Sequence, residues 1–262
     1  MLHIPYGRGF LEFDAGNAPV LRSRVNELRS VSDGQEIVRA AMEHPIGSPR
    51  LSELARGKSS CVIIISDHTR PVPSRDILPN MLRELREGSP DIRVTLLVAT
   101  GFHRATTAQE LEEKLGAELL AQCRVVVHDC ADAESNVTVG VLPSGTPLVI
   151  DRLAADAELL IAEGFIEPHF FAGFSGGRKS ILPGICSEKT VNENHSFRAI
   201  SSPNAKTGVL DGNPIHKDMV EAARRVNVQF ILNVALGEKK QIIAAFAGDL
   251  EQAHEEGVAF IR

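Results

Sequence analysis

Hydrophobic and polar positions follow two patterns from residue 61 onward: short, nearly continuous apolar runs, and longer segments whose apolar residues lie on one helical face. The short runs are typical of strands buried on both faces, and the longer segments are typical of amphipathic helices. Their alternation predicts a largely parallel sheet flanked by helices. We expect strands at Cys61 to Ser66, Arg93 to Thr100, Arg124 to Asp129, Glu158 to Ile166 and Gln229 to Leu236, with a sixth candidate at Gln241 to Ala247.

Two of the segments between these strands carry clear helix signals. Ser74 to Glu87 places its apolar side chains on one face and stops before Gly88. Thr107 to Leu120 begins with a capping threonine and has Glu110 three residues later, which is the spacing of a capping box. The order of strands and helices therefore indicates an α/β fold, Rossmann-like in its connections.

The first part of the chain and its last segment are less regular. We expect an edge strand near Leu11 to Phe13 and a helix from Asp33 to Met42, both placed against the sheet. Residues 201 to 214 are rich in turn formers and are interpreted as a loop. Asp249 is expected to cap a helix that begins at Leu250 and continues to the last residue. This ending is compatible both with an interrupted protein and with an ordinary C-terminal helix.

Composition narrows the class of protein. With 262 residues, 43% hydrophobic and 24% charged, the chain can bury the core of a large α/β domain. The net charge of −6 and the pI near 5.9 argue against a general nucleic-acid binder. The N-terminus lacks the apolar core of a signal peptide, and no apolar stretch is long enough to cross a bilayer. We therefore expect a cytoplasmic protein without a nucleic-acid or membrane partner.

The four cysteines show no C-x-x-C spacing, which argues against a zinc site or a disulfide framework. Cys61 lies inside an apolar strand pattern, so a buried thiol is expected there.

Residues able to carry chemistry follow three of the predicted strands. Asp67-His68-Thr69-Arg70 comes after the first strand, Gly101-Phe102-His103-Arg104 after the second, and Glu167-Pro168-His169 after the fourth. Ligands of parallel α/β sheets bind beyond the carboxyl ends of the strands. These three segments are therefore the candidates for one common site.

The segment from Asp67 to Arg70 has two interpretations. Asp67 and Thr69 are good caps for the helix that follows. Arg70 adds a second possibility, because a guanidinium beside a helix N-terminus is suited to clamp a phosphate group.

His103 and His169 follow two different parallel strands, so they could face each other across one ligand. Either histidine alone could simply hydrogen-bond a neighbouring carbonyl group. Because imidazole exchanges protons near neutral pH, we favour a catalytic pair.

A glycine-rich segment, Gly173 to Ser180, comes close to the P-loop pattern, but Arg178 stands where that pattern requires its last glycine. Pro183 and Gly184 would also break the helix that a P-loop requires. Gly176 and Gly177 still allow backbone N–H groups to approach an anionic ligand. Lys179 is then available for charge neutralisation or for covalent attachment of a cofactor.

The remaining histidines divide into one candidate and four without supporting context. His195 follows a polar stretch and is a candidate metal ligand, with surface exposure as the alternative. His44, His128, His216 and His254 are treated as structural or solvated.

Taken in order, Asp67-His-Thr-Arg-Pro, Gly101-Phe-His103-Arg, His169-Phe-Phe-Ala-Gly-Phe-Ser-Gly-Gly-Arg-Lys179 and Asn194-His195 resemble the nickel-pincer nucleotide-dependent lactate racemase family. The resemblance implies a pyridinium-3,5-bisthiocarboxylic acid mononucleotide that holds nickel and is attached covalently to Lys179 through a thioamide. It also implies that His195 is the nickel ligand, that Asp67, His68, Thr69 and Arg70 hold the ribose and phosphate, and that His103 and His169 are the two catalytic histidines.

The resemblance further implies a reaction. Removing the C2 proton of a 2-hydroxy acid is difficult beside an anionic carboxylate, and reversible hydride transfer to the cofactor avoids the dianion. One histidine takes the hydroxyl proton and the other returns it, so that His103 and His169 exchange roles with the direction of the reaction. Lactate is the default substrate, and malate, aromatic lactates and sugar acids are equally compatible with the sequence.

Family members are longer, with a second domain that supplies substrate-orienting residues. The resemblance therefore implies that residues 1 to 262 form the N-terminal, cofactor-binding and catalytic domain and that the C-terminal domain is absent from this chain. We expect little racemase activity from the chain alone. The expected partners are the 2-hydroxy acid and the cofactor-synthesis proteins. The alternative is a noncatalytic phosphate- or nucleotide-binding module that uses the same glycine-rich loop.

Overall fold

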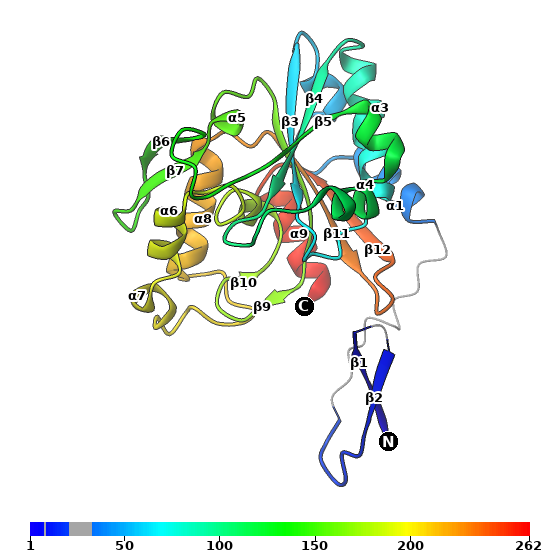
Figure 1. Ribbon diagram of the computed structural model, residues 1–262, viewed down its shortest axis with the longest axis vertical. Helices are drawn as coiled ribbons and strands as arrows, with labels where there is room; N and C mark the ends of the chain where they lie inside the picture. The colour runs from blue at the N-terminus through cyan, green and yellow to red at the C-terminus, as the bar shows by residue number, and fades with distance from the viewer. Residues whose placement is uncertain (8, 21–32) are drawn as a thin grey trace.

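A six-stranded sheet organises the protein, as shown by a computed structural model that describes residues 1–7, 9–20 and 33–262 (Figure 1). The strand order is β12-β11-β8-β3-β4-β5, and only β12 runs antiparallel to its neighbour. The fold is thus α/β with a largely parallel sheet, and all six predicted strands are confirmed. Their bounds are β3 (Ser60–Ser66), β4 (Arg93–Ala99), β5 (Arg124–Val127), β8 (Leu160–Phe165), β11 (Phe230–Leu236) and β12 (Ile242–Gly248).

The connections change direction at β3. From β3 the chain runs outward through β4 and β5, and then returns to place β8 and β11 on the other side of β3. Val62 of β3 pairs with Leu160 of β8, while Ser60 pairs with Arg93 of β4. Such a reversal leaves a crevice beyond the carboxyl ends of the strands on either side of it.

Helices cover both faces of the sheet (Figure 1). Alternation along β3 sends Ile63 and Ile65 into the core under one layer of helices and Val62 and Ile64 into the core under the other. The first layer contains α1 (Gly34–Glu43), α2 (Leu51–Leu54), α3 (Ser74–Gly88) and α4 (Ala108–Gln122). The second contains α5 (Arg152–Ala155), α6 (Glu188–Asn194), α7 (Phe197–Ile200), α8 (Pro214–Arg225), α9 (Gln252–Ile261) and the hairpin of β6 (Asn136–Val141) and β7 (Pro147–Asp151).

Helix ends agree with the local signals in the sequence. Thr107 and Glu110 form the predicted capping box of α4, with the Glu110 amide donating to Thr107 Oγ1 at 3.3 Å. Asp33 caps α1. Asp249 accepts from the amides of Glu251 and Gln252 at 3.0 Å, but α9 begins at Gln252, two residues later than predicted.

Two further expectations are settled by the fold. Residues 201–213 form turns that lead into α8, as predicted. Cys61 is a buried free thiol, as predicted. Within the ranges described, no helix combines the length and apolar character required to cross a membrane.

The placement of the N-terminal strand was wrong. β2 (Gly9–Phe13) does form at the predicted position, but it pairs with β1 (Leu2–Tyr6) in a separate hairpin rather than with the central sheet. Figure 1 shows this hairpin, drawn in blue, projecting away from the α/β body. An apolar alternation of this length predicts a strand but does not identify its partner.

Candidate active site and cofactor cleft

A cleft of about 350 Å³ opens beyond the carboxyl ends of β3, β4 and β8, at the reversal of strand order. The three segments predicted to share a site therefore do meet. Of the predicted site residues, the cleft is lined by Asp67, Arg70, His103, His169, Gly176, Lys179 and His195. The other three are next to lining residues in the sequence: His68 and Thr69 follow Asp67, and Gly177 follows Gly176.

Asp67 orients His103. The Asp67 carboxylate is only 1% exposed, and its Oδ2 lies 2.6 Å from Nδ1 of His103. Its Oδ1 accepts from the backbone amide and the hydroxyl of Thr69, at 3.1 and 2.8 Å. Because a carboxylate only accepts, Nδ1 of His103 carries the proton and Nε2 is left as the acceptor. Asp67 and Thr69 do not cap the following helix, whose N-cap is Pro73.

Arg70 extends from the same loop into the cleft. Its guanidinium is exposed and donates to Thr69 Oγ1 at 3.1 Å, which leaves most of its donors free for an anionic group. Lys114 Nζ stabilises the same loop by donating to the carbonyl oxygen of Val72 at 3.3 Å. His68 Nδ1 contacts Thr106 Oγ1 at 3.0 Å, so His68 anchors the loop rather than lining the cleft.

His169 lies in the short strand β9 (Pro168–His169), which pairs with β10 (Gly173–Phe174). Its Nδ1 accepts from the amide of Ala172 at 3.2 Å, so a neutral ring carries its proton on Nε2. Burial, followed by the charge of Lys179, lowers the pKa of His169 to about 3 and keeps the ring neutral. His169 therefore has the opposite tautomer to His103, and the two rings offer a donor and an acceptor to one cleft.

The glycine-rich loop is held by Asn233 of β11. Gly176 and Gly177 have φ values of +78° and +52°, and a Cβ at Gly176 would collide with Asn233 Oδ1. The same oxygen accepts from the Gly177 amide at 2.7 Å. Only glycine combines this backbone with this approach. The turn leads into a 3₁₀ helix, η2 (Gly177–Ser180), rather than the long helix of a P-loop.

Lys179 extends from η2 into the cleft, with its ammonium 5.9 Å from the centre of the Phe171 ring. Burial lowers the pKa of Lys179 to about 7, and the charges of Arg178 and Arg70 act in the same direction. A substantial fraction of the amine is therefore unprotonated near neutral pH, which is the form that acts as a nucleophile.

Arg178 is the residue whose role the sequence did not reveal. It is 2% exposed, and its guanidinium donates to the carbonyls of Ala172, Ser175 and Gly176 at 2.9 to 3.2 Å. Its other contacts are Nδ1 of His216 at 3.0 Å and Nε2 of His254 at 2.9 Å. We call Arg178, His216 and His254 the Arg178 clamp. It fixes the loop between His169 and Lys179 to α8 and α9.

The three members of the clamp are far apart in the chain, and neither histidine has a motif around it. The one available signal was the arginine at the position where a P-loop needs glycine.

His195 ends α6 and lines the cleft. Its Nδ1 is buried and has no hydrogen-bond partner among the described residues. Burial, followed by the charge of Lys179, lowers the pKa of His195 to about 4, so the ring is neutral. A buried imidazole nitrogen without a partner fits a metal ligand. The described ranges contain no group of three His, Cys, Asp or Glu residues that could hold a metal by themselves, so the other donors would have to come from a bound group.

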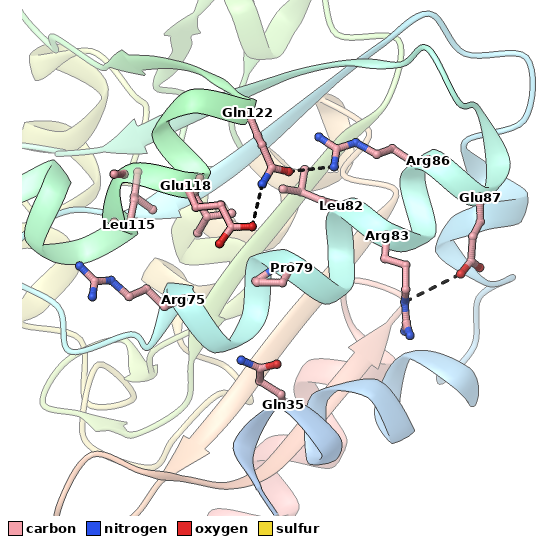
Figure 2. Close-up of a pocket in the computed structure, with 13 residues that line it drawn as sticks. Gln35, Arg75, Pro79, Leu82, Arg83, Arg86, Glu87, Leu115, Glu118 and Gln122 are labelled. Carbon is pink, nitrogen blue, oxygen red and sulfur yellow. Dashed lines mark hydrogen bonds and ion pairs between the residues drawn. The ribbon is translucent and has the colours of Figure 1, made fainter.

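A second, larger hollow of about 890 Å³ lies between α3 and α4 (Figure 2). Several of its polar side chains are paired with one another: Arg86 donates to Gln122 at 2.8 Å, and Arg83 lies 3.8 Å from Glu87. It contains none of the predicted site residues. The candidate site is therefore the cleft at the strand ends.

The fold and the cleft define a class: an α/β protein with a cleft at the reversal of its strand order, lined by two histidines of opposite tautomer and a buried lysine. The profile of the lactate racemase N-terminal domain matches residues 6–208. The chain belongs to the lactate racemase family.

Two curated relatives are similar over most of this chain. The lactate racemase of Thermoanaerobacterium thermosaccharolyticum is 50% identical over 263 residues, covering 99% of this chain and 62% of that protein. The lactate racemase of Lactiplantibacillus plantarum is 56% identical over 228 residues, covering 87% and 54%. The chain thus spans less than two thirds of the length of either relative.

Solved structures agree with this assignment. The lactate racemase apoprotein from T. thermosaccharolyticum superimposes with a TM-score of 0.92 at 50% identity, covering 98% of this chain and 61% of that chain. A protein from Thermotoga maritima superimposes with a TM-score of 0.71 at 25% identity, covering 87% and 58%.

Acid should weaken the Arg178 clamp. Burial, followed by the charge of Arg178, lowers the pKa of His254 to about 3, whereas the unfolded chain takes up this proton near pH 6.5. Stability is therefore complete above pH 6.5 and falls as the pH decreases toward 3. We expect His254 to contribute a loss of about 2 kcal/mol between pH 7 and pH 4.5.

The measurement is the urea concentration at the midpoint of unfolding, as a function of pH, for the wild type and His254→Gln. The glutamine amide can take the place of Nε2 and does not titrate. The variant should show a shallower decline, and the exposed His44→Gln should not. Parallel curves for all three proteins would contradict the assignment.

Proposed function

We propose that this chain is the cofactor-binding and catalytic part of an enzyme that racemises or epimerises a 2-hydroxy acid, with lactate as the default substrate. The observation that carries the proposal is that His103 and His169, in opposite tautomers, line the same cleft as Lys179. Racemisation requires an acid/base on each face of the substrate, and this arrangement supplies one for each.

A nickel-pincer nucleotide fits the residues present. Lys179 supplies a partly unprotonated amine for covalent attachment, and His195 supplies an unpartnered buried nitrogen for nickel. Arg70 has free donors that would hold the phosphate, and the loop of Asp67, His68 and Thr69 would hold the ribose. Gly176 and Gly177 lack the Cβ atoms that would meet Asn233 and His254, so they allow the turn that leads to Lys179. The chemistry that this group supplies when bound is reversible acceptance of the C2 hydride of the substrate.

The two histidines manage the hydroxyl proton. Nε2 of His103 accepts it from one enantiomer, and the Asp67 carboxylate stabilises the imidazolium that forms. His169 returns a proton on the other face as an imidazolium that donates from Nε2, so its neutral ring must take up a second proton before this step. The same groups act in the opposite order in the reverse reaction, because each step must be reversible.

The domain assignment is also part of this proposal. Residues 1 to 262 form the N-terminal domain, and the substrate pocket is completed by the polypeptide that the longer relatives carry outside the matched region. The substrate is then a small 2-hydroxy acid, and the cytoplasmic proteins that make the cofactor are transient partners. Robust turnover by the cofactor-loaded chain alone would contradict the assignment.

The test is coexpression with cofactor-synthesis proteins, followed by intact-mass measurement and a screen of chiral 2-hydroxy acids. We expect a covalent mass increase that survives denaturation. Reversible nucleotide binding without an adduct would favour the noncatalytic binding module instead. Nickel content alone does not discriminate, because exposed histidines also bind nickel.

A further inference from the structure

The N-terminal hairpin of β1 and β2 has one apolar face. Successive side chains on a strand point to opposite sides, and residues that pair across the hairpin share a side. His3 and Glu12 are paired on one side, which also carries Phe10. The other side carries most of the apolar residues, in the pairs Leu2 with Phe13, Ile4 with Leu11 and Tyr6 with Gly9.

This face is uncovered. Tyr6 is 70% exposed, Phe13 52% and Leu11 50%. In the part of the chain that the structure describes, β1 and β2 form a sheet of their own and bond to no other strand (Figure 1). A two-stranded hairpin is marginal in water, and a contiguous exposed apolar patch marks a contact surface. Both strands also present free edges to which a further strand could add.

The comparisons favour one occupant. The structural match to the T. thermosaccharolyticum apoprotein covers 98% of this chain, which leaves about five of 262 residues outside it, fewer than the hairpin contains. The hairpin is therefore part of the shared fold. The same match covers 61% of the relative, so 39% of that chain lies outside the region of similarity.

We propose that the apolar face of the hairpin, formed by Leu2, Ile4, Tyr6, Leu11 and Phe13, is a docking surface for the polypeptide that lactate racemases carry outside the region matched here. The hairpin then ties the two ends of the family's chain together. A second copy of this chain is a weaker fit, because five side chains provide only part of the roughly 800 Å² per partner that a stable dimer buries.

Hydrogen exchange tests the docking. In this chain the hairpin amides should exchange rapidly, at a rate independent of protein concentration. In the longer T. thermosaccharolyticum lactate racemase, the amides of the aligned hairpin should exchange about 100-fold more slowly, because the hairpin must detach from its docking partner before exchange occurs. Rapid exchange in both proteins would overturn the proposal. Slow exchange in this chain that appears only with dimerisation would assign the face to a second copy.

Paired substitutions locate the surface. Ile4→Ser with Leu11→Ser should leave the melting temperature of this chain unchanged, because the face is exposed here. The same pair at the aligned positions of the longer relative should lower its melting temperature and restore rapid exchange. His3→Ser with Glu12→Ser, on the opposite face, should do neither. Equal effects of the two pairs in the relative would overturn the assignment of the face.

Discussion

Replacement of Lys179 by alanine should leave the chain without any covalently attached group. Among the residues that the structure describes, Lys179 is the one lysine that lines the cleft, and burial together with the neighbouring guanidinium groups lowers its pKa to about 7. An amine that is partly unprotonated at neutral pH can condense with a thiocarboxylic acid, and alanine has no such group. The measurement is the intact mass of the denatured protein after coexpression with cofactor-synthesis proteins, where the wild type should retain the added mass completely.

Three further variants make this result specific. Lys179→Arg keeps the positive charge but should also lose the adduct, because a guanidinium stays protonated. Lys189→Ala changes an exposed lysine on α6 and should retain it. His195→Ala should retain the organic mass and lose nickel. An adduct that persists in Lys179→Ala would show that another residue is the attachment point and would remove the main support for the proposed function.

Replacement of Arg178 by methionine should destabilise the protein by about 3 to 5 kcal/mol. Methionine fills much of the volume, but the carbonyls of Ala172, Ser175 and Gly176 and Nδ1 of His216 lose the donor that Arg178 supplies, and His254 loses its contact with the guanidinium. Each buried acceptor that is left without a donor costs about 1 to 3 kcal/mol. The measurement is the free energy of unfolding in urea at pH 7.

The matched control is Arg198→Met on α7, which removes an exposed guanidinium and should change the unfolding free energy by less than about 0.5 kcal/mol. Arg178→Lys should fall between the two, because a single ammonium cannot reach all the acceptors of the planar fork. A loss below about 1 kcal/mol for Arg178→Met would mean that water replaces the guanidinium and that the clamp is not structural.

The sheet was predictable because its strands are buried on both faces. Such strands read as continuous apolar runs, so Ser60–Ser66 and Phe230–Leu236 stand out without any tertiary information. The meeting of Asp67, His103 and His169 follows from the same rule, since parallel strands direct their carboxyl ends to one edge.

Contacts between distant segments could not be read in this way. The carboxylate of Asp67 is equally suited to cap a helix and to hold an imidazole, and only the three-dimensional position of His103 decides between them. Likewise, His216 and His254 carry no local signal, and their burial against Arg178 depends on how α8 and α9 pack. The apolar pattern of β2 likewise does not show that it pairs with β1 rather than with the central sheet.

The Arg178 clamp also limits how far the loop from His169 to Lys179 could be grafted onto another protein. His169 is proposed for proton transfer and Lys179 for cofactor attachment, and the two lie ten positions apart on one short segment. A segment this short would be simple to move into another protein. The loop, however, takes its shape from an asparagine on β11 and from histidines on two separate helices. Grafting residues 168–180 onto another parallel α/β scaffold would therefore transfer the side chains without their positions, unless those three supports were rebuilt with it.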